Sequence, residues 1–177
     1  MTALNIVREK EVGTIEQINV TPIKKWEFIL GKLIPFWIIG MIVFTIGLLV
    51  IWAVYGITSL GSLPLLYVVA GTYMIALLGF GLLVSTFCES QVQAMFVAFF
   101  FILIFILMSG LFTAVQSMPH WARIISGLTP VSHFIKIMRM IMLKGSGFSD
   151  ILTELGYILT FALVLNALAI WNYRKTS

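Results

Sequence analysis

Four long stretches that carry almost no charge constrain this chain more than any other feature of its sequence. They cover residues 33–57, 64–87, 92–115 and 151–173, and Glu154 is the one Asp, Glu, Lys, Arg or His inside them. A helix of about 20 apolar residues crosses the ~30 Å hydrocarbon core of a bilayer. Buried helices of a soluble protein would need polar faces toward water, and the first three stretches have none. The sequence therefore predicts an all-α membrane protein with four transmembrane helices.

The overall composition supports a bilayer environment. Hydrophobic residues make up 60% of the chain and charged residues only 10%, whereas soluble domains carry about 25% charged residues. Before its first charge the N-terminus has no apolar segment of the length that a cleavable signal peptide needs, so we expect the first span to direct insertion. The single cysteine, Cys88, excludes an intrachain disulfide and a multi-cysteine metal site.

Lys and Arg counts predict the orientation. Four spans place both termini on one side of the membrane, and that side carries seven Lys or Arg residues against four in the long loop before the last span. Because cytoplasmic loops carry an excess of positive charge, we expect both termini in the cytoplasm of a multi-pass protein of the cell (inner) membrane. No basic patch interleaved with stacking aromatic residues lies outside the spans, so no nucleic-acid partner is expected.

The charged segment before the first span has helix-start signals. Thr14 and Gln17 have the spacing of a capping box, and Thr21 followed by Pro22 is typical of an N-cap with proline at the first helical position. From Pro22 onward the apolar positions share one face, with Trp26 at headgroup depth. This pattern predicts an interfacial amphipathic helix whose anchors are Trp26, Lys24 and Lys25. Glu9, Glu11 and Glu16 suit a protein partner better than an anionic lipid surface.

This N-terminal segment, "EKEVGTIEQINVTPIKKWEFILGKL", resembles the cytoplasmic coupling region of type-2 ABC transporter permeases. That region follows roughly the pattern E-x-G-T-x-E-x-x-x-x-[ST]-P. The matching positions are Glu11, Gly13, Thr14, Glu16, Thr21 and Pro22, and Gln17 lies among them. The resemblance implies that these residues dock on an ATP-binding subunit and pass its movement to the helices.

The segment before the last span, "SGLFTAVQSMPHWARIISGLTPVSHFIKIMRMIMLKG", resembles the extracellular re-entrant segment of the same family. Its sequence predicts a short helix from Met118 to about Gly127, and then a second helix with Thr129 as cap, Pro130 as first residue and Gly145 at its end. The second helix is too short and too charged to span. Its apolar face contains Phe134, Ile137, Met138, Ile141 and Met142, with His133, Lys136 and Arg139 opposite.

Two interpretations of the second helix stay open. It is either an extracellular gate, with candidates Pro119, Trp121, Pro130, Phe134 and Ile137, or a surface helix whose cations meet phosphate headgroups. The break around 127–129 is non-helical backbone at membrane depth, so we expect protein to cover it.

Other chemistry is not indicated by the sequence. No G-x-x-x-x-G-K-[ST] motif occurs, so we expect no enzyme activity, and ATP would be used by a partner subunit. No catalytic, cofactor-binding or metal-binding residues are predicted. No charge lies mid-membrane, where ion-coupled carriers keep their relay groups.

These features together predict the membrane-spanning permease part of an ATP-driven exporter for a drug-like or lipid-like amphiphile. The alternative is a membrane scaffold or assembly subunit that docks a cytoplasmic partner. The expected layout is a coupling segment (1–32), three spans (33–115), the re-entrant segment (116–150), and the last span with its tail (151–177). Such permeases usually have six spans, so the chain resembles a C-terminal portion. The resemblance implies an ATPase subunit, a second permease copy or paralogue forming a dimer, and further N-terminal spans as partners.

Overall fold

A computed structural model describes residues 2–11, 25–112 and 114–172, and every regular element in these ranges is helical. Four of the helices are long and apolar enough to cross a membrane. They are α3 (Lys25–Tyr55), α4 (Leu63–Phe87), α5 (Gln91–Met108) and α8 (Phe148–Asn172). The shorter elements are α1 (Thr2–Glu11), η1 (Val115–Ser117), α6 (His120–Leu128) and α7 (Pro130–Lys144). The prediction of an all-α protein with four spans is confirmed.

The ends of the helices follow from local chemistry. The Ser62 hydroxyl accepts the Leu65 amide at the start of α4, and the Ser90 hydroxyl accepts the Gln93 amide at the start of α5. The third span was predicted to reach residue 115, but α5 ends at Met108. Its last turn is closed by the Ser109 hydroxyl, which donates to the Ile106 carbonyl. Gly110 then takes a φ of +78°, a left-handed conformation that ends a helix and that glycine adopts without strain.

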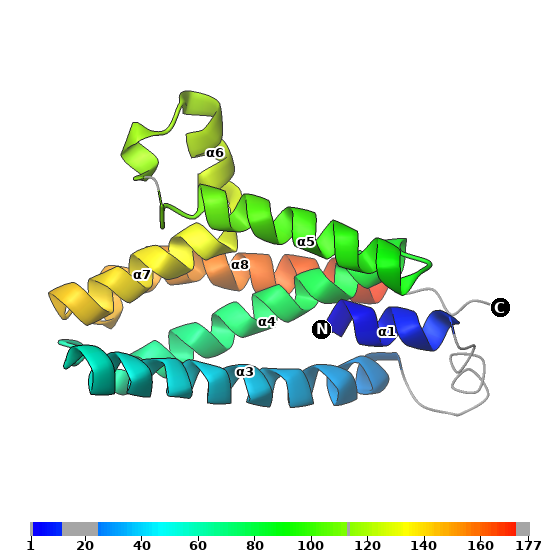
Figure 1. The fold of residues 1–177 in the computed structure, drawn as a ribbon, viewed down its shortest axis with the longest axis horizontal. Helices are drawn as coiled ribbons and strands as arrows, with labels where there is room; N and C mark the ends of the chain where they lie inside the picture. The colour runs from blue at the N-terminus through cyan, green and yellow to red at the C-terminus, as the bar shows by residue number, and fades with distance from the viewer. Residues whose placement is uncertain (1, 12–24, 113, 173–177) are drawn as a thin grey trace.

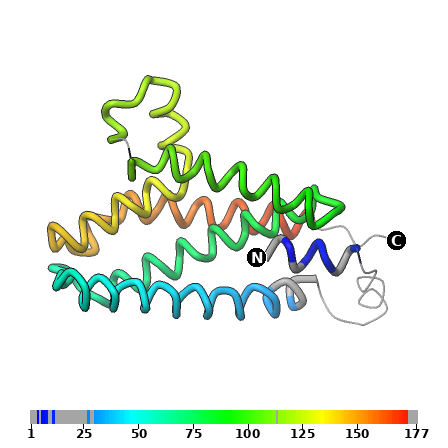
Figure 2. Tube along the Cα trace, in the orientation of Figure 1, coloured from blue at the N-terminus to red at the C-terminus, as the bar shows by residue number. Residues whose placement is uncertain are grey.

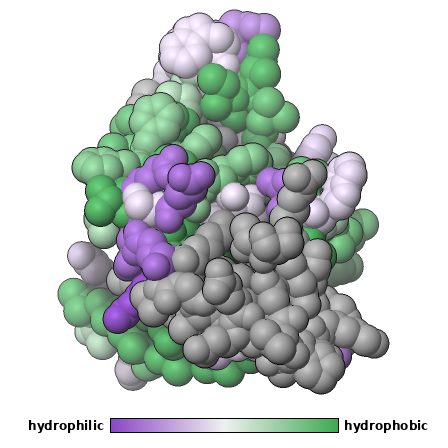
Figure 3. Space-filling model, turned by 90° about the vertical axis from the view of Figure 1, so that its right-hand side faces the viewer, coloured by the Kyte–Doolittle hydropathy of each residue, from purple (hydrophilic) through white to green (hydrophobic). Residues whose placement is uncertain are grey.

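The spans alternate in direction, and α4 lies at their centre. It contacts α1, α3, α5, α7 and α8, and Figures 1 and 2 show α3 on one side of it and α5 and α8 on others. The N-termini of α3 and α5 and the C-termini of α4 and α8 meet at one end, beside α1. Figure 3 views this end: among the described residues, hydrophilic surface lies mainly left of the middle of the view, and hydrophobic surface lies toward its edges. That distribution fits a bundle whose sides face lipid and whose end faces water.

The core is built where α4, α7 and α8 meet. A cluster of buried apolar residues there consists of Leu66, Val69, Ala76, Ile137, Ile141, Ile151, Leu155, Ile158 and Ala162. Side-chain hydrogen bonds also join the spans. The Trp37 indole donates to the Gly71 carbonyl at 3.1 Å, and the Asn166 amide donates to the Ile75 carbonyl at 3.1 Å. By contrast, α3 and α5 expose many large apolar side chains, as helices do when their outer faces meet lipid.

The loop between α3 and α4 packs tightly against α7. The Leu60 amide donates to the Met142 carbonyl at 3.2 Å, and a Cβ at Gly61 would lie 2.7 Å from the Ile141 carbonyl oxygen. Backbone cannot move aside as a side chain can. This loop therefore fixes where the C-terminal end of α7 lies.

Gly61→Ala is expected to destabilise the purified chain by roughly 1–3 kcal/mol, the usual cost of overpacking. Gly147→Ala is the matched control, because Gly147 also lies in a loop next to a helix and no atom lies within 4 Å of its added Cβ. The measurement is the free energy of unfolding in a mixed-micelle denaturation. Equal stability of the two variants would show that the loop moves freely relative to α7.

Candidate functional site

Most of the predicted coupling residues lie outside the described residues. These are Gly13, Thr14, Glu16, Gln17, Thr21 and Pro22, and the predicted anchor Lys24 also lies outside them. Lys25 and Trp26 open α3, which then continues without a break into the first span. Glu11 ends α1. The amphipathic start at Pro22 and the docking role of the segment therefore stay predictions.

Glu11 holds the N-terminus of α5. Its carboxylate accepts the Gln91 backbone amide at 2.7 Å and also the Gln91 side-chain amide. These two bonds, the side-chain one first, lower the pKa of the Glu11 carboxyl below its ordinary value. A carboxylate is favoured there because the first amides of a helix are unpaired and its dipole is positive at that end. The residue that begins the predicted coupling pattern is thus bonded directly to a membrane-spanning helix.

The packed helix α1 was not predicted from the sequence. Ile6 and Val7 are both buried. Ile6 packs with Leu33, Leu82 and Ala169, whereas Val7 packs with Val84, Cys88 and Ala94. In the sequence, Ile6 and Val7 are only two neighbouring apolar residues ahead of charged ones. Two residues do not establish the apolar periodicity from which a packed helix is predicted. In the structure α1 is nevertheless joined to α4 and α5 ahead of the coupling segment.

At the opposite end of the bundle, α6 and α7 form a broken helix with a polar joint. Pro130 begins α7, and Gly145 ends it with a φ of +65°, as predicted. Thr129 is the N-cap residue, as predicted, although its hydroxyl makes no cap bond. The hydroxyl donates back to the Ser126 carbonyl at 2.9 Å, and the Ser132 hydroxyl bonds the same carbonyl. The Ser126 carbonyl also accepts the Thr129 backbone amide at 3.2 Å, so backbone and side chains together satisfy it at the end of α6.

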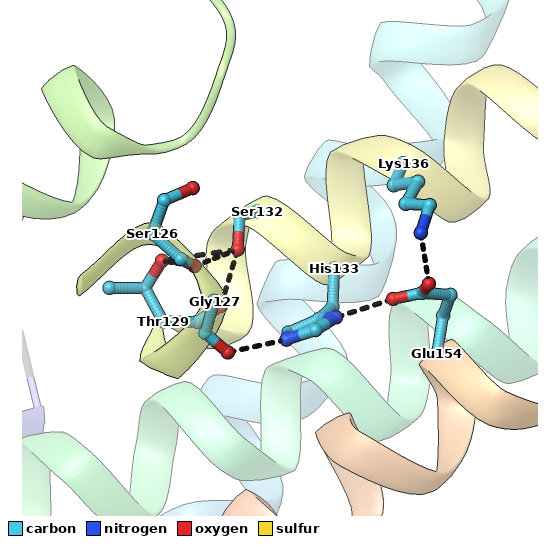
Figure 4. A network of polar contacts seen from close by, with 7 residues as sticks. All are labelled: Ser126, Gly127, Thr129, Ser132, His133, Lys136 and Glu154. Atoms are coloured by element: carbon cyan, nitrogen blue, oxygen red, sulfur yellow. Dashed lines mark hydrogen bonds and ion pairs between the residues drawn. The ribbon is translucent and has the colours of Figure 1, made fainter. Parts of the chain in front are cut away.

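The expectation that protein covers the break is confirmed in part. Ser126, Thr129 and Pro130 are buried, whereas Gly127 and Leu128 are exposed. The exposed Gly127 carbonyl is bonded by the His133 ring, with 2.8 Å between the oxygen and Nε2. Figure 4 shows the Ser126, Thr129 and Ser132 contacts on one side of the joint and His133 on the other. The joint is therefore satisfied by hydrogen bonds even where it is not buried.

His133 links this joint to the last span through Glu154. Nδ1 of His133 lies 2.5 Å from one Glu154 oxygen, and the Lys136 ammonium bonds the other (Figure 4). The two ring nitrogens of His133 thus face two oxygens, one of the Gly127 carbonyl and one of the Glu154 carboxylate. Tyr157 stacks on the ring, with 4.7 Å between centroids. Glu154 thus ties α7 to α8.

The sequence analysis did not find this cluster. It noted Glu154 as the one charge in the fourth apolar stretch and His133 and Lys136 as the polar face of the second outer helix. The available signal was that lone acid, located after a loop that contains all four of the far-side Lys and Arg residues. Pairing these groups needs the packing of α7 on α8, which no local pattern supplies.

The predicted apolar face of α7 packs against the spans. Ile137 and Ile141 are fully buried, and Phe134 stacks on Tyr73 of α4 with 4.1 Å between centroids and 10° between planes. Met138 and Met142 pack against the same core. Of the other gate candidates, Pro130 is buried, whereas Pro119 and Trp121 are exposed, Trp121 by 61%. The arrangement favours the interpretation in which α7 packs on the spans over one in which it rests on headgroups; whether it gates a pathway stays a prediction.

No group of three or more His, Cys, Asp or Glu side chains that could hold a metal ion occurs in the part of the chain that the structure describes. What the described residues offer is an all-helical membrane bundle with a broken helix at one end and a short packed helix at the other. These features define a polytopic membrane protein.

Comparison with known proteins shows the family. The chain belongs to the ABC-2 family of transporter proteins, whose model matches residues 1–171. It is similar to the "Probable multidrug ABC transporter permease YbhR" of Escherichia coli, with 35% identity over 176 residues, 99% of this chain and 48% of the relative. It is also similar to the "Probable multidrug ABC transporter permease YbhS" of Escherichia coli, with 33% identity over 147 residues, 82% of this chain and 39% of the relative.

A third relative is the "Inner membrane transport permease YhhJ" of Escherichia coli, 26% identical over 180 residues, which cover 99% of this chain and 47% of the relative. The chain thus spans about half the length or less of the curated relatives it matches. No solved structure matches it. The resemblance to type-2 ABC permeases, seen first in the coupling and re-entrant segments, is confirmed.

Proposed function

We propose that this chain is a membrane-spanning permease part of an ATP-driven exporter. It would move a drug-like or lipid-like amphiphile out of the cytoplasm, with ATP hydrolysed by a separate ATPase subunit. The observation that carries the proposal is the similarity to two permeases named as multidrug transporters, one of them along 99% of this chain. The largely uncharged spans support an amphiphile as cargo over an ion, because ion-coupled carriers keep charged relay groups within the membrane.

Two parts of the proposed permease would work together: the coupling segment that follows Glu11, which lies at one end of the bundle, and α7 at the other end. The coupling segment 11–22 would receive movement from the ATPase. Glu11 and the buried Ile6 and Val7 connect this end to α4 and α5. α7 packs on α4 and α8 at the other end, so α4 contacts both regions. A shift of α4 would displace α7, because the two helices are packed against each other. A second permease copy or paralogue would complete a pathway between two such bundles.

Glu16→Lys tests the coupling role. In a permease co-expressed with its ATPase, we expect the variant to insert normally but to lose co-purification with the ATPase and export. The physical reason is that like charges placed in contact across an interface oppose binding strongly, whereas one charge on a solvated surface changes stability little. The measurements are pull-down of the ATPase and efflux of a fluorescent amphiphile.

Glu89→Lys is the matched control, because Glu89 is exposed in the turn between α4 and α5 at the same end of the bundle. It should retain both the ATPase and export. Equal losses in the two variants would mean that overall charge at this end matters and that the coupling segment has no special role. Full binding and export by Glu16→Lys would contradict docking there.

The proposed topology has both termini in the cytoplasm of the inner membrane. In a Cys88→Ala background, an impermeant thiol reagent added from outside should label Ser146→Cys. It should not label Ser90→Cys or Ser177→Cys. Ser146 follows α7 at one end of the bundle, and Ser90 precedes α5 at the other. Labelling of Ser177→Cys from outside would overturn the orientation.

A further inference from the structure

A large pocket opens where α5 ends and the broken helix begins. Its volume is about 920 Å³, and its walls come from the end of α5, the η1 segment, α6, α7 and the first turns of α8. Pockets of about 300–1,000 Å³ are typical of sites for drug-sized ligands. The joint drawn in Figure 4 forms part of its wall, since Ser126, Gly127, Ser132, His133, Lys136 and Glu154 all line it. The pocket is therefore held in shape by the polar network of the broken helix.

The pocket carries an excess of positive charge. Its lining includes Arg123, Lys136, Arg139 and Lys144, and among the described lining residues Glu154 is the one acid. Glu154 already bonds Lys136 and His133.

The two arginines have only uncharged partners. Arg123 donates to the Gln116 and Met118 carbonyls, and Arg139 donates to the Gly110 carbonyl at 3.0 Å. A carbonyl orients a guanidinium but does not neutralise it. Within the described ranges, no ion pair joins Arg123, Arg139 or Lys144 to a carboxylate. Both guanidinium groups are thus positioned and still available to an anion.

The side chains that line the pocket favour one kind of anion over others. Beside the cations lie apolar side chains, among them Val115, Ile135 and Met140. A fully hydrated small anion gains nothing from such surface, whereas an anionic group attached to an acyl chain contacts both parts. Arginine matches phosphate oxygens with two parallel donors.

We propose that this pocket binds the phosphate group of an anionic phospholipid, with Arg139 and Arg123 as the phosphate ligands and Lys144 adding positive charge. The apolar wall holds the first part of the acyl chains. The proposal concerns binding alone, so it stands or falls independently of export and of the ATPase.

The test is a binding titration on the full chain in nanodiscs of phosphatidylcholine. Pyrene-labelled phosphatidylglycerol is titrated in, and energy transfer from the tryptophans of the protein reports its binding. Arg139→Gln should weaken the apparent affinity about tenfold, which corresponds to about 1.4 kcal/mol. Glutamine removes the charge but keeps an N–H donor for the Gly110 carbonyl, which limits structural damage. Arg139→Lys should retain most of the binding, because it keeps the charge in the pocket.

Arg8→Gln is the control, since it removes the same charge from α1 at the far end of the bundle. It should leave the affinity unchanged. Pyrene-labelled phosphatidylcholine should bind every variant equally and weakly. The proposal is overturned if Arg139→Gln binds phosphatidylglycerol as the unmodified chain does, or if Arg8→Gln weakens binding as much. Displacement of the lipid by inorganic phosphate at matched concentration would overturn the assignment to a lipid, because free phosphate would then suffice.

Discussion

Phe134→Ala is expected to destabilise the bundle by roughly 2–5 kcal/mol, the range for large-to-small substitutions in packed cores. Phe134 stacks on Tyr73 and packs against the cluster that includes Ile137 and Ile158. Truncation leaves a void between α7 and α4 that the buried neighbours cannot fill by small shifts. In a permease assembled with its ATPase, the same loss should alter basal ATPase activity, because a few kcal/mol shifts a two-state equilibrium substantially.

Lys136→Ala is the comparison for this experiment. The Lys136 side chain is 62% exposed, and Glu154 retains His133 as a partner when Lys136 is removed. Its removal should cost about 1 kcal/mol or less and leave ATPase activity nearly unchanged. The measurements are the free energy of unfolding and the basal ATPase rate. The opposite result would be large changes in stability and ATPase rate for Lys136→Ala and none for Phe134→Ala. It would contradict a packed gate and would favour a helix held at the lipid surface by its charges.

Glu154→Gln should cost roughly 2–4 kcal/mol of stability, somewhat below the ~3–5 kcal/mol for breaking a fully buried ion pair. Glu154 is 13% exposed and is the group to which both His133 and Lys136 bond. Glutamine keeps the shape but removes the charge. One carboxylate oxygen becomes an NH2 donor, so either His133 or Lys136 loses its acceptor. The remaining contact is also weaker without the charge, and the joint between α6 and α7 loosens.

Asp150→Asn is the matched control for this variant. Asp150 lies one turn earlier on α8, is exposed, and accepts the Gly147 amide, a bond that asparagine retains. A double-mutant cycle with His133→Asn sharpens the test. Because the two side chains are in contact, the effects of Glu154→Gln and His133→Asn should be non-additive by about 0.5–3 kcal/mol. Strict additivity would show that the pair contributes nothing to the joint.

The sequence alone determined the features that depend on neighbouring residues. The four spans were predicted because each is a continuous apolar run, and length and composition decide whether a helix crosses a bilayer. The start of α7 at Pro130 and its end at Gly145 follow from the fixed φ of proline and the freedom of glycine at positive φ. The family was also predictable, because its coupling and re-entrant segments are recognised by residue types at fixed, short spacings.

Only the tertiary structure decided which residues meet. Glu11 and Gln91 are 80 positions apart, and His133 and Glu154 are 21 apart. In a soluble protein, the apolar face of each helix would have indicated its packing side. In a bilayer both the packed and the lipid-facing sides are apolar, because lipid tails are as hydrophobic as leucine. The hydropathy pattern therefore predicts that α4, α5 and α8 span the membrane. It does not indicate which face of α8 contacts α7. That choice depends on shape and on a few polar contacts, such as the one that Glu154 makes, and these exist only once the helices have packed.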